Sequence, residues 1–485
     1  MGTEIQGPVR VRFAPSPTGY LHVGGVRTAI YNDLLRQHAG GAFVLRIEDT
    51  DRERSDEAMT CQIQEALAWI GVEWDEGPFL QSERLPRHRE HAAELLAAGR
   101  AYRCFCTPAE LDAQRAQAEK KGQAFRYPRT CLQLDPREVE NRLALGQPFA
   151  VRFRMPDENI RFHDLVRGDI DFPPDALDDF ILLRSDGSPT YHMSVVADDI
   201  DMAITHVIRG EDHLSNTPKH IPLFRALGAT EPVFGHLPLI LGPDKKRLSK
   251  RTGATSVEEF RAEGILPQAL YNYMALLGWN PGDDREILSR REMAEAFSVD
   301  RLNASAAIFD REKLAWVNSQ YLSSLPLEEI LPHLRPFLAQ TGLAEADTAR
   351  LAEALELHRS RAHTLKGLAE LVVPYFRNRL DYDPASVAKF QKDPDLPAHL
   401  AALGERWAAL PSFDKESLEA ALRTLCAERG IKAGVLIHPA RMALSAAEAG
   451  PPVFDLVAVM GREATARHLA SFIELLRAGR ADPPG

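Results

Sequence analysis

The first 85 residues alternate between two hydrophobic periodicities. Mostly apolar runs at 8–15 and 42–49 predict strands. Apolar residues at helical spacing over 24–40 and 56–71, each run ending in glycine, predict the helices that follow them. The order strand, helix, strand, helix is typical of a parallel sheet covered by helices.

A different pattern interrupts this alternation between residues 86 and 188. That stretch carries a polar helix near 108–120 and short strands such as the one at 150–156. The alternation then returns, with predicted strands at 179–185, 202–210 and 233–242 and a predicted helix over 213–227. We therefore expect an α/β Rossmann-type domain that is interrupted by an inserted α+β domain.

After residue 250 the pattern is almost entirely helical. Ala and Leu dominate, and Pro and Gly separate the helical runs. The expected organisation is a split Rossmann-type domain, an inserted domain, a connecting domain and an all-α C-terminal region. The expected bounds are 1–85 with 189–250, 86–188, 251–325 and 326–485.

Composition narrows the class of protein. A length of 485 residues suggests about three domains or more, and the 45% hydrophobic and 26% charged fractions exclude a largely disordered chain. No apolar run approaches the ~18 residues that a membrane span needs, and the N-terminus lacks the apolar core of a signal peptide. The five cysteines are an odd, sparse set, with Cys61 and Cys426 expected in the core. We expect a cytoplasmic protein with no membrane partner.

Charge is unevenly distributed along the chain. The net charge of −11 argues against a protein that binds nucleic acid over its whole surface, although a local basic face can still do so. Residues 242–254 (GPDKKRLSKRTGA) hold five cations and one acid. This loop follows the last predicted strand, where open α/β sheets bind ligands, so it could close over a polyphosphate. The alternative is a solvated basic loop.

A second candidate site begins at the end of the first strand. In RFAPSPTGYLHVGG (12–25), His22 stands just before Gly24 and Gly25, which open a helix. The glycines allow close approach of a ligand, and the helix start offers free N–H groups to an anion, with the His22 ring as a further donor. The segment is neither a P-loop nor a dinucleotide fingerprint. Taken alone, it is more simply an ordinary tight turn.

Together the two motifs resemble the paired signatures of class I aminoacyl-tRNA synthetases. HVGG (22–25) matches the first, with Gly25 where the pattern has a second histidine. RLSKR (247–251) matches the second, with Arg247 in place of the leading lysine. Further strings follow in the order typical of bacterial-type glutamyl-tRNA synthetases: LRIEDTD (45–51), QSER (81–84), GSPTYH (187–192) and VIRGEDHLSNTP (207–218). The resemblance covers about residues 1–325.

The resemblance implies an ATP-dependent ligase. In this family the α-carboxylate of L-glutamate attacks the α-phosphate of ATP and releases pyrophosphate, and the 3′-terminal ribose of tRNA(Glu) then takes the glutamyl group. Positioning and electrostatic stabilisation suffice for both steps, so no side-chain nucleophile is expected. The implied cofactors are ATP and Mg²⁺, the implied partners are L-glutamate and tRNA(Glu), and a monomer is expected.

The resemblance also assigns residues to this chemistry. The implied catalytic residues are His22 and Lys250. The implied ATP-binding residues are Pro15, Ser16, His22, Gly24, Gly25 and Lys250, and those around glutamate are Arg12, Ser16, Glu48, Tyr191 and Arg209. Two arginines and one acid suit a ligand with two carboxylates and one ammonium, because a guanidinium can hold a carboxylate in a bidentate pair. Without the resemblance these residues would be interpreted as strand-end ion pairs.

The remaining domains receive roles in the same way. The inserted domain would bind the tRNA acceptor end, residues 251–325 would contact the stem, and residues 326–485 would bind the anticodon. In LHRSRAHTLKGL (357–368), an arginine is expected to read the third anticodon base, with Arg361 preferred to Arg359.

The inserted stretch also holds a candidate metal site, Cys104, Cys106 and Cys131. Some relatives bind structural zinc through a C-x-C pair, a later cysteine and a fourth His or Tyr. Gln133 occupies the place of the histidine in the commoner set, so Tyr127 is the candidate fourth ligand, although phenolate competes poorly beside thiolate. The alternative is three reduced cysteines without metal.

Other functions share part of the pattern. A glutaminyl-tRNA synthetase has a β-barrel anticodon region, whereas residues 326–485 are helical in pattern. A tRNA-modifying paralogue lacks the anticodon region, and a free-standing nucleotidyltransferase lacks the long helical extension. A tRNA-binding scaffold needs neither His22 nor Lys250. Within the preferred interpretation, an enzyme that also charges tRNA(Gln) with glutamate stays an alternative.

The basic loop yields a first prediction. Lys250→Ala should lower kcat by roughly 10²–10³, because one donor that stabilises the charge developing on the phosphates is lost. The fold and tRNA binding should stay largely intact. Steady-state aminoacylation measures the effect. Near-normal turnover in this variant would refute the assignment of the loop to the active site.

Overall fold

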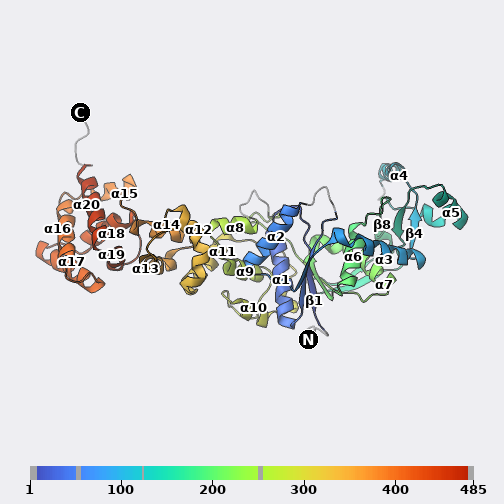
Figure 1. Cartoon of the computed structure of the whole chain (residues 1–485), viewed down its shortest axis with the longest axis horizontal. Helices are drawn as coiled ribbons and strands as arrows, with labels where there is room; N and C mark the ends of the chain where they lie inside the picture. Colours follow the sequence, from blue (N-terminus) through green and yellow to red (C-terminus); the bar gives the residue numbers. More distant parts are fainter. Residues whose placement is uncertain (1–7, 51–55, 123–124, 249–254, 479–485) are drawn as a thin grey trace, which may run out of the picture. The chain divides into compact units, whose positions relative to one another are not determined.

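The computed structural model describes residues 8–50, 56–122, 125–248 and 255–478. The chain divides into two compact units. Unit 1 consists of Met1–Glu259 and Leu270–Asp310, and unit 2 consists of Phe260–Ala269 and Arg311–Gly485. In Figure 1 the strands of residues 10–237 lie in the part of the chain coloured from blue to green, which belongs to unit 1.

Seven strands form the central sheet of unit 1. They are β1 (Arg10–Phe13), β2 (Ala42–Ile47), β3 (Glu76–Leu80), β6 (Ile160–Asp164), β7 (Gly168–Phe172), β9 (His206–Gly210) and β10 (Val233–Leu237). Their spatial order is β3-β2-β1-β9-β10-β6-β7. All neighbours are parallel except the edge pair β6–β7. Side chains of β1, β2 and β9 are almost all buried, and they include the arginines Arg12, Arg46 and Arg209 as well as apolar residues.

Helices of unit 1 cover this sheet. They are α1 (Val23–Ala39), α2 (Glu57–Ile70), α3 (Leu85–Ala97), α6 (Tyr191–Asp201) and α7 (Thr217–Ala226). Gly40 and Gly71 end α1 and α2 with φ of 64° and 83°, a left-handed conformation that glycine adopts without a steric cost. The strands and helices predicted for the first 71 residues are confirmed within the described residues.

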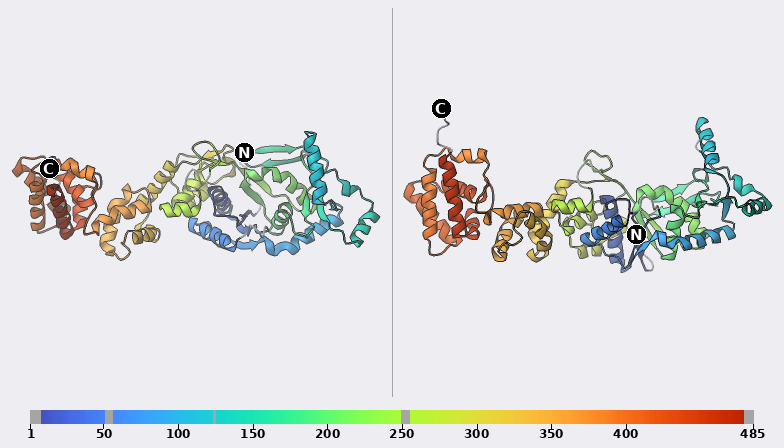
Figure 2. Two further views of the ribbon diagram at one scale, coloured as in Figure 1. Left: turned by 90° about the horizontal axis from the view of Figure 1, so that it is seen from above. Right: turned by 45° about the horizontal axis from the view of Figure 1, so that its top comes forward.

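The stretch between α3 and α6 also forms a smaller, three-stranded sheet. Its strands are β4 (Ala101–Cys104), β5 (Ala150–Phe153) and β8 (Ile181–Leu183), and its helices are α4 (Pro108–Lys120) and α5 (Pro136–Ala144). Figure 2 shows α4, in cyan, standing away from the strands. The predicted polar helix near 108–120 and the strand near 150 are confirmed.

The strand at 179–185 is predicted where the alternation returns, and the expected bounds place it within the inserted domain, 86–188. It is β8, which pairs antiparallel with β5 in the small sheet. The Phe153 N–H donates to the Phe180 carbonyl at 2.8 Å, and the two rings lie 5.5 Å apart. The strands that extend the main sheet from this stretch are instead β6 and β7. An apolar run predicts a strand but does not encode its partner, so packing against β5 decides the sheet.

The chain passes from unit 1 into unit 2 within α8 (Val257–Glu263), returns within α9 (Pro267–Leu276), and leaves unit 1 again after Asp310. Before that exit, unit 1 contains α10 (Arg290–Ala296) and a two-stranded sheet of β11 (Ile240–Leu241) and β12 (Ala307–Ile308).

Unit 2 is helical throughout its described residues. Its further helices are α11 (Arg311–Ser324), α12 (Leu327–Gln340), α13 (Thr348–His358), α14 (Leu365–Val372), α15 (Pro384–Phe390), α16 (Leu396–Ala409), α17 (Lys415–Arg429), α18 (Gly434–Ser445), α19 (Val453–Met460) and α20 (Arg462–Ala478). In its core, Trp407 is buried and its Nε1–H donates to the Leu418 carbonyl at 3.0 Å. The predicted fold class, an α/β Rossmann-type domain with an α+β insertion followed by an all-α region, is confirmed.

Two smaller expectations have different outcomes. Cys426 is buried, as expected, whereas Cys61 is exposed because it lies on the solvent side of α2, opposite the buried Ile63, Leu67 and Ile70.

In the part of the chain that the structure describes, no helix combines the length and apolar character needed to cross a bilayer.

Candidate active site

The carboxyl ends of three parallel strands meet at one edge of the main sheet. Strand β1 lies between β2 and β9 and is parallel to both. Arg12 is near the end of β1, Glu48 follows β2, and Arg209 is near the end of β9. Ligands bind at such an edge in open α/β sheets. The structure therefore brings together three predicted site residues that are far apart in the sequence.

Arg12 and Glu48 lie in a cluster of buried charges. Asp199, on α6, lies 2.6 Å from Nη1 of Arg46 and 3.4 Å from Nε of Arg12. Arg46 also lies 3.6 Å from Glu48. Burial raises the pKa of the Glu48 carboxyl more than the charges of Arg46 and Arg12 lower it, so the net pKa is above its ordinary value. An additional cation beside Glu48 would stabilise its ionised form.

Arg209 is buried among neutral hydrogen-bond partners. Its Nε donates to Nε2 of His236 at 3.1 Å, and its Nη2 donates to Oγ1 of Thr217 at 2.8 Å and to the carbonyl of His213 at 3.3 Å. Among the described residues, no carboxylate lies within 4.0 Å of the guanidinium. Burial lowers the pKa of Arg209, which means that its charge is only partly compensated. A carboxylate ligand would supply the missing counter-charge.

Tyr191 stands beside this arginine at the start of α6. Its hydroxyl lies 2.9 Å from Nδ1 of His213 and accepts from Nη1 of Arg209 at 3.3 Å. Burial raises the pKa of Tyr191 to about 12, so the side chain is a neutral phenol at physiological pH. It can orient a polar ligand but adds no charge to the site.

His22 is the N-cap residue of α1. Its Nδ1 accepts the backbone N–H groups of Gly24 at 3.1 Å and Gly25 at 3.3 Å. The expectation that these two N–H groups are free for an anion is therefore wrong, because an N-cap side chain reaches the second and third residues of its own helix. A Cβ added at Gly24 would lie 3.0 Å from Cε1 of the ring, so glycine leaves room for this cap.

The cap also determines what His22 can offer to a ligand. The protein around the ring, by desolvating it, and the charge of Arg247 both lower the pKa of His22. In the neutral ring Nδ1 is the acceptor, so Nε2 carries the proton. The side chain remains a donor toward a ligand, but through Nε2 alone.

The basic loop is anchored beside this helix start. After the loop, the chain is described again from Thr255, whose carbonyl accepts the N–H of Val23 at 2.9 Å, and Ser256 forms a bridge with His22. Within the loop, Arg247 forms a bridge with Leu241, the residue that precedes the loop. Lys250 itself lies outside the described residues. The residues on either side of the loop are nevertheless held within the Rossmann-type unit, and one of them touches the first signature.

Pro15 and Ser16 lie in the turn that follows β1. The Pro15 carbonyl accepts the N–H of Glu48 at 3.0 Å, which ties this turn to the end of β2. Ser16 is exposed. The turn that holds both residues is thus tied to Glu48 of the charged cluster.

The three cysteines converge with Tyr127. The sulfurs of Cys104, Cys106 and Cys131 lie within 4.8 Å of one another. The Tyr127 hydroxyl lies 3.4 Å from Sγ of Cys104 and 3.4 Å from Sγ of Cys106. Four ligands of a tetrahedral zinc with Zn–S bonds of about 2.3 Å are about 3.8 Å apart, so this donor set fits the metal. The hydrogen bond between Cys104 and Cys131 lowers the pKa of the Cys104 thiol and raises the pKa of the Cys131 thiol.

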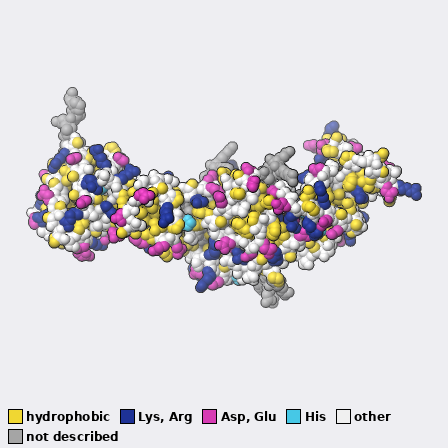
Figure 3. Space-filling model, in the orientation of Figure 1, with side chains coloured by type: hydrophobic (Ala, Val, Ile, Leu, Met, Phe, Trp, Pro, Cys, Tyr) yellow, Lys and Arg dark blue, Asp and Glu magenta, His cyan; other side chains and the backbone are white. Residues whose placement is uncertain are grey.

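Arg361 and Arg359 differ in their surroundings within unit 2. Arg361 is one of the residues around a cavity of about 740 Å³ between the start of α14 and the loop after α18. It makes no hydrogen bond or ion pair with a described residue. Arg359 instead donates to the Leu325 carbonyl at 2.7 Å and lies 2.9 Å from Glu356. Of the two, Arg361 is available to an external ligand. Basic and acidic side chains are interspersed on the face of unit 2 seen in Figure 3.

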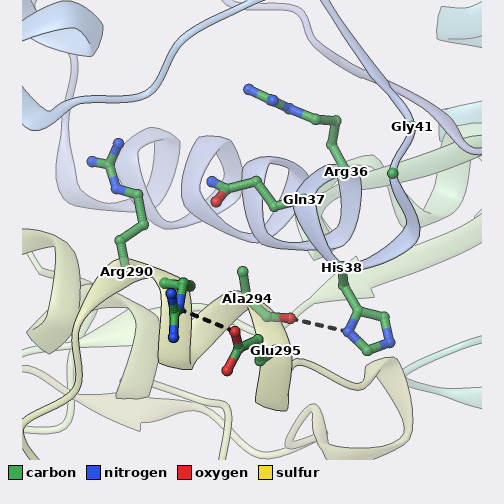
Figure 4. Close-up of a pocket in the computed structure, with 9 residues that line it drawn as sticks. Arg36, Gln37, His38, Gly41, Arg290, Ala294 and Glu295 are labelled. Carbon is green, nitrogen blue, oxygen red and sulfur yellow. Dashed lines mark hydrogen bonds and ion pairs between the residues drawn. The ribbon is translucent and has the colours of Figure 1, made fainter.

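A larger cavity, of about 910 Å³, lies at the opposite end of α1 from His22. Figure 4 shows its basic residues, but their polar groups are already used within the protein. Arg36 donates to the Glu73 carbonyl at 3.2 Å, Arg290 to the Ile70 carbonyl at 2.8 Å, and His38 contacts the Ala294 carbonyl at 3.0 Å. This cavity is a weaker candidate than the carboxyl edge of the sheet.

Sequence reasoning missed several polar residues of the site. They are Arg46, Asp164, Asp199, His213, Thr217 and His236. Arg46, His213 and Thr217 lie inside quoted motif strings, so the motifs could have indicated them. Asp199 and Asp164 carry no such signal, because their partners are far away in the sequence and are fixed only by tertiary packing.

Comparison with known proteins agrees with this geometry. A family model described as tRNA synthetases class I (E and Q), catalytic domain, matches residues 8–316. A model described as an anticodon binding domain matches residues 329–473.

Similar proteins match over nearly the whole chain. Glutamate–tRNA ligase 2 of Koribacter versatilis is 46% identical over 473 residues, which is 97% of this chain and 98% of that protein. Glutamate–tRNA ligase of Desulforudis audaxviator is 45% identical, with 94% of each chain covered. The crystal structure of a glutamate tRNA ligase from Elizabethkingia meningosepticum, in complex with its amino acid, has a TM-score of 0.89 at 36% identity and covers 97% of this chain and 100% of that chain.

Proposed function

Because this chain belongs to the class I tRNA synthetases for glutamate and glutamine, we propose that it ligates L-glutamate to the 3′ end of tRNA(Glu). The reaction passes through a glutamyl-adenylate and releases AMP and pyrophosphate. The observation that carries this proposal is the pair of buried arginines, Arg12 and Arg209, beside the carboxylate of Glu48 at one sheet edge. This set complements a ligand with two carboxylates and one ammonium.

The amino acid is held by charge complementarity. Arg209, which lacks a counter-charge among the described residues, pairs with the γ-carboxylate, and the Tyr191 hydroxyl orients it. Glu48 pairs with the ammonium group, which stabilises a carboxylate whose burial is otherwise incompletely compensated. Arg12 and Ser16 complete the pocket.

The residues that face ATP act by positioning and by stabilising charge. The Nε2–H of His22 donates to a phosphate oxygen, and Gly24, Gly25 and Pro15 allow the nucleotide to approach the start of α1. Lys250, in the loop anchored at Thr255, neutralises charge that develops on the phosphates. Mg²⁺ would accompany ATP and would help to neutralise the charge of its phosphates.

The domain roles follow the same proposal. Residues 86–188 bind the acceptor end of the tRNA, residues 251–325 contact its stem, and residues 326–485 bind its anticodon. The enzyme acts as a monomer in the cytoplasm.

Charging with labelled amino acids tests the proposed function. The wild-type protein should attach labelled glutamate, and not labelled glutamine, to purified tRNA(Glu) in the presence of ATP and Mg²⁺. Glutamate attached to tRNA(Gln) would extend the function to both tRNAs. Glutamine attached to either tRNA, or no charging at all, would overturn the proposal.

The same assay yields a prediction for Arg209. Arg209→Gln should raise the KM for glutamate far more than the KM for ATP and weaken discrimination against glutamine, because the partner of the γ-carboxylate is lost. Arg36→Gln, at the other end of α1, is the matched control and should leave both KM values near those of the wild type. An unchanged KM for glutamate in Arg209→Gln would make Arg209 a structural residue.

We also propose that Cys104, Cys106, Tyr127 and Cys131 hold a structural zinc ion. The convergence of their side chains supports this, and the guanidinium of Arg152, 4.0 Å from the centre of the Tyr127 ring, offsets the negative charge of such a site. Protein purified without chelator should contain about one zinc per chain by elemental analysis. Cys131→Ser should lower both the zinc content and the melting temperature, whereas Cys426→Ser should leave the zinc content unchanged. A fully active, metal-free wild-type preparation would refute the site.

Arg361 gives a prediction about tRNA choice. We propose that it reads the third anticodon base, because its donors suit the acceptors of cytosine and oppose the N–H groups of guanine. Arg361→Gln should lower charging of tRNA(Glu) and narrow its advantage over tRNA(Gln) in kcat/KM. Arg359→Gln, whose native side chain is bonded within the protein, should leave that ratio unchanged. An equal loss on both tRNAs that low salt relieves would instead assign Arg361 to a phosphate contact.

A further inference from the structure

A chain of buried hydrogen bonds leads from Asp164 to Arg209. Oδ2 of Asp164 lies 2.6 Å from Nδ1 of His236, and Nε2 of the same ring lies 3.1 Å from Nε of Arg209. Asp164 and His236 are fully buried and Arg209 is 6% exposed. The register of the sheet creates this contact, because His236 of β10 pairs directly with Arg209 of β9.

Asp164 is held in place by the backbone. Its Oδ1 accepts the N–H groups of Val166 at 3.0 Å, Arg167 at 2.9 Å and His236 at 3.2 Å. Burial raises the pKa of the Asp164 carboxyl. The hydrogen bonds from His236 and from these N–H groups together lower it by more than burial raises it, so the net pKa is below the ordinary value. The carboxylate is ionised and can only accept hydrogen bonds.

The ionised carboxylate fixes the proton of the His236 ring. Burial lowers the pKa of His236 more than Asp164 raises it, so the ring is neutral and carries one proton. Because Oδ2 of Asp164 can only accept, that proton lies on Nδ1. Nε2 is then an acceptor that faces the Nε–H of Arg209, and it also lies 3.0 Å from the Thr217 hydroxyl.

We propose that Asp164 and His236 are positioning residues that fix the Arg209 guanidinium for the substrate carboxylate. His236 holds the Nε–H, while Thr217 and the His213 carbonyl take both N–H groups of Nη2. The guanidinium is thereby fixed in plane, with Nη1 directed to the Tyr191 hydroxyl and one N–H of Nη1 without a described partner. The inference rests on the proposed function, since it assumes that Arg209 binds the γ-carboxylate of glutamate.

The decisive variant is Asp164→Asn. The amide oxygen can keep the backbone contacts of Oδ1, while the amide N–H₂ replaces Oδ2 opposite His236. The ring must then accept at Nδ1 and carry its proton on Nε2, so two N–H donors face each other at Arg209. We expect the KM for glutamate to rise about 10- to 100-fold, the scale of a lost hydrogen bond to a charged group, with the KM for ATP unchanged.

Asp33→Asn is the matched control. Asp33 is also a buried carboxylate of unit 1, and it accepts from Tyr271 and Gln37 on the side of α1 away from the site. Its variant should leave the KM for glutamate near that of the wild type, even if it lowers the melting temperature. A similar rise in both Asn variants would assign the effect to general destabilisation.

A double-mutant cycle separates positioning from a structural role. In His236→Gln there is no imidazole ring whose proton Asp164 could fix, while Oε1 of the glutamine can still accept from Arg209. Adding Asp164→Asn to this variant should therefore raise the KM for glutamate less than about threefold. A rise as large as that in the wild-type background would overturn the proposal. If Asp164→Asn does not fold, His236→Gln and His236→Met are compared instead. Methionine lacks a strong acceptor, so His236→Met should have a higher KM for glutamate than His236→Gln. Equal KM values in the two variants would refute the positioning role.

Wild-type charging runs in the same assay. Absence of glutamate charging there would refute the proposed function itself. Normal wild-type charging with an unchanged KM for glutamate in Asp164→Asn would refute only the positioning role.

Discussion

The parallel pairing of β1 with β2 and β9 is the constraint on which the site depends. Parallel register aligns the carboxyl ends of neighbouring strands, so Arg12, Glu48 and Arg209 arrive at one edge although up to 197 residues separate them in the sequence. The same edge receives the turn at Pro15 and the start of α1. Because all these positions are set by backbone hydrogen bonds, the side chains are held before any ligand binds.

Buried charge is the second determinant of the site. Transfer of an ion from water to a protein interior costs on the order of several kcal/mol of solvation free energy unless partners of opposite charge compensate it. Arg46 and Asp199 compensate each other at 2.6 Å, and that pair supports Arg12. Arg209 and Glu48 are less fully compensated, as the directions of their pKa shifts indicate. A ligand of opposite charge at each position therefore gains both attraction and relief of this burial cost.

The interrupting stretch contributes to the site as well as to the small sheet. Strand β6 adds to the main sheet beside β10 and carries Asp164 to the ring of His236. Asp164, which lies within the expected inserted domain, is thus part of the hydrogen-bond network that holds Arg209. The cysteine cluster, by contrast, lies in a separate hydrophobic core with Tyr102, Phe105 and Tyr127. The buried residues of β5 and β8 share their core with residues of the main sheet.

The sequence by itself determined the first strands and helices and their order, because periodicity and glycine stops are local properties of the chain, and its motif strings carried the resemblance to the family. Through the resemblance it also placed Cys104, Cys106, Cys131 and Tyr127 in one candidate set. Tertiary structure alone decided that β6 joins the main sheet while β8 pairs with β5, that the His22 ring caps its own helix, and that Cys61 faces solvent. It also decided that Asp164 meets His236 and Asp199 meets Arg12. The physical reason is that a strand's partner and a buried charge's neighbour are set by packing between distant segments, which leaves no periodic trace in the sequence.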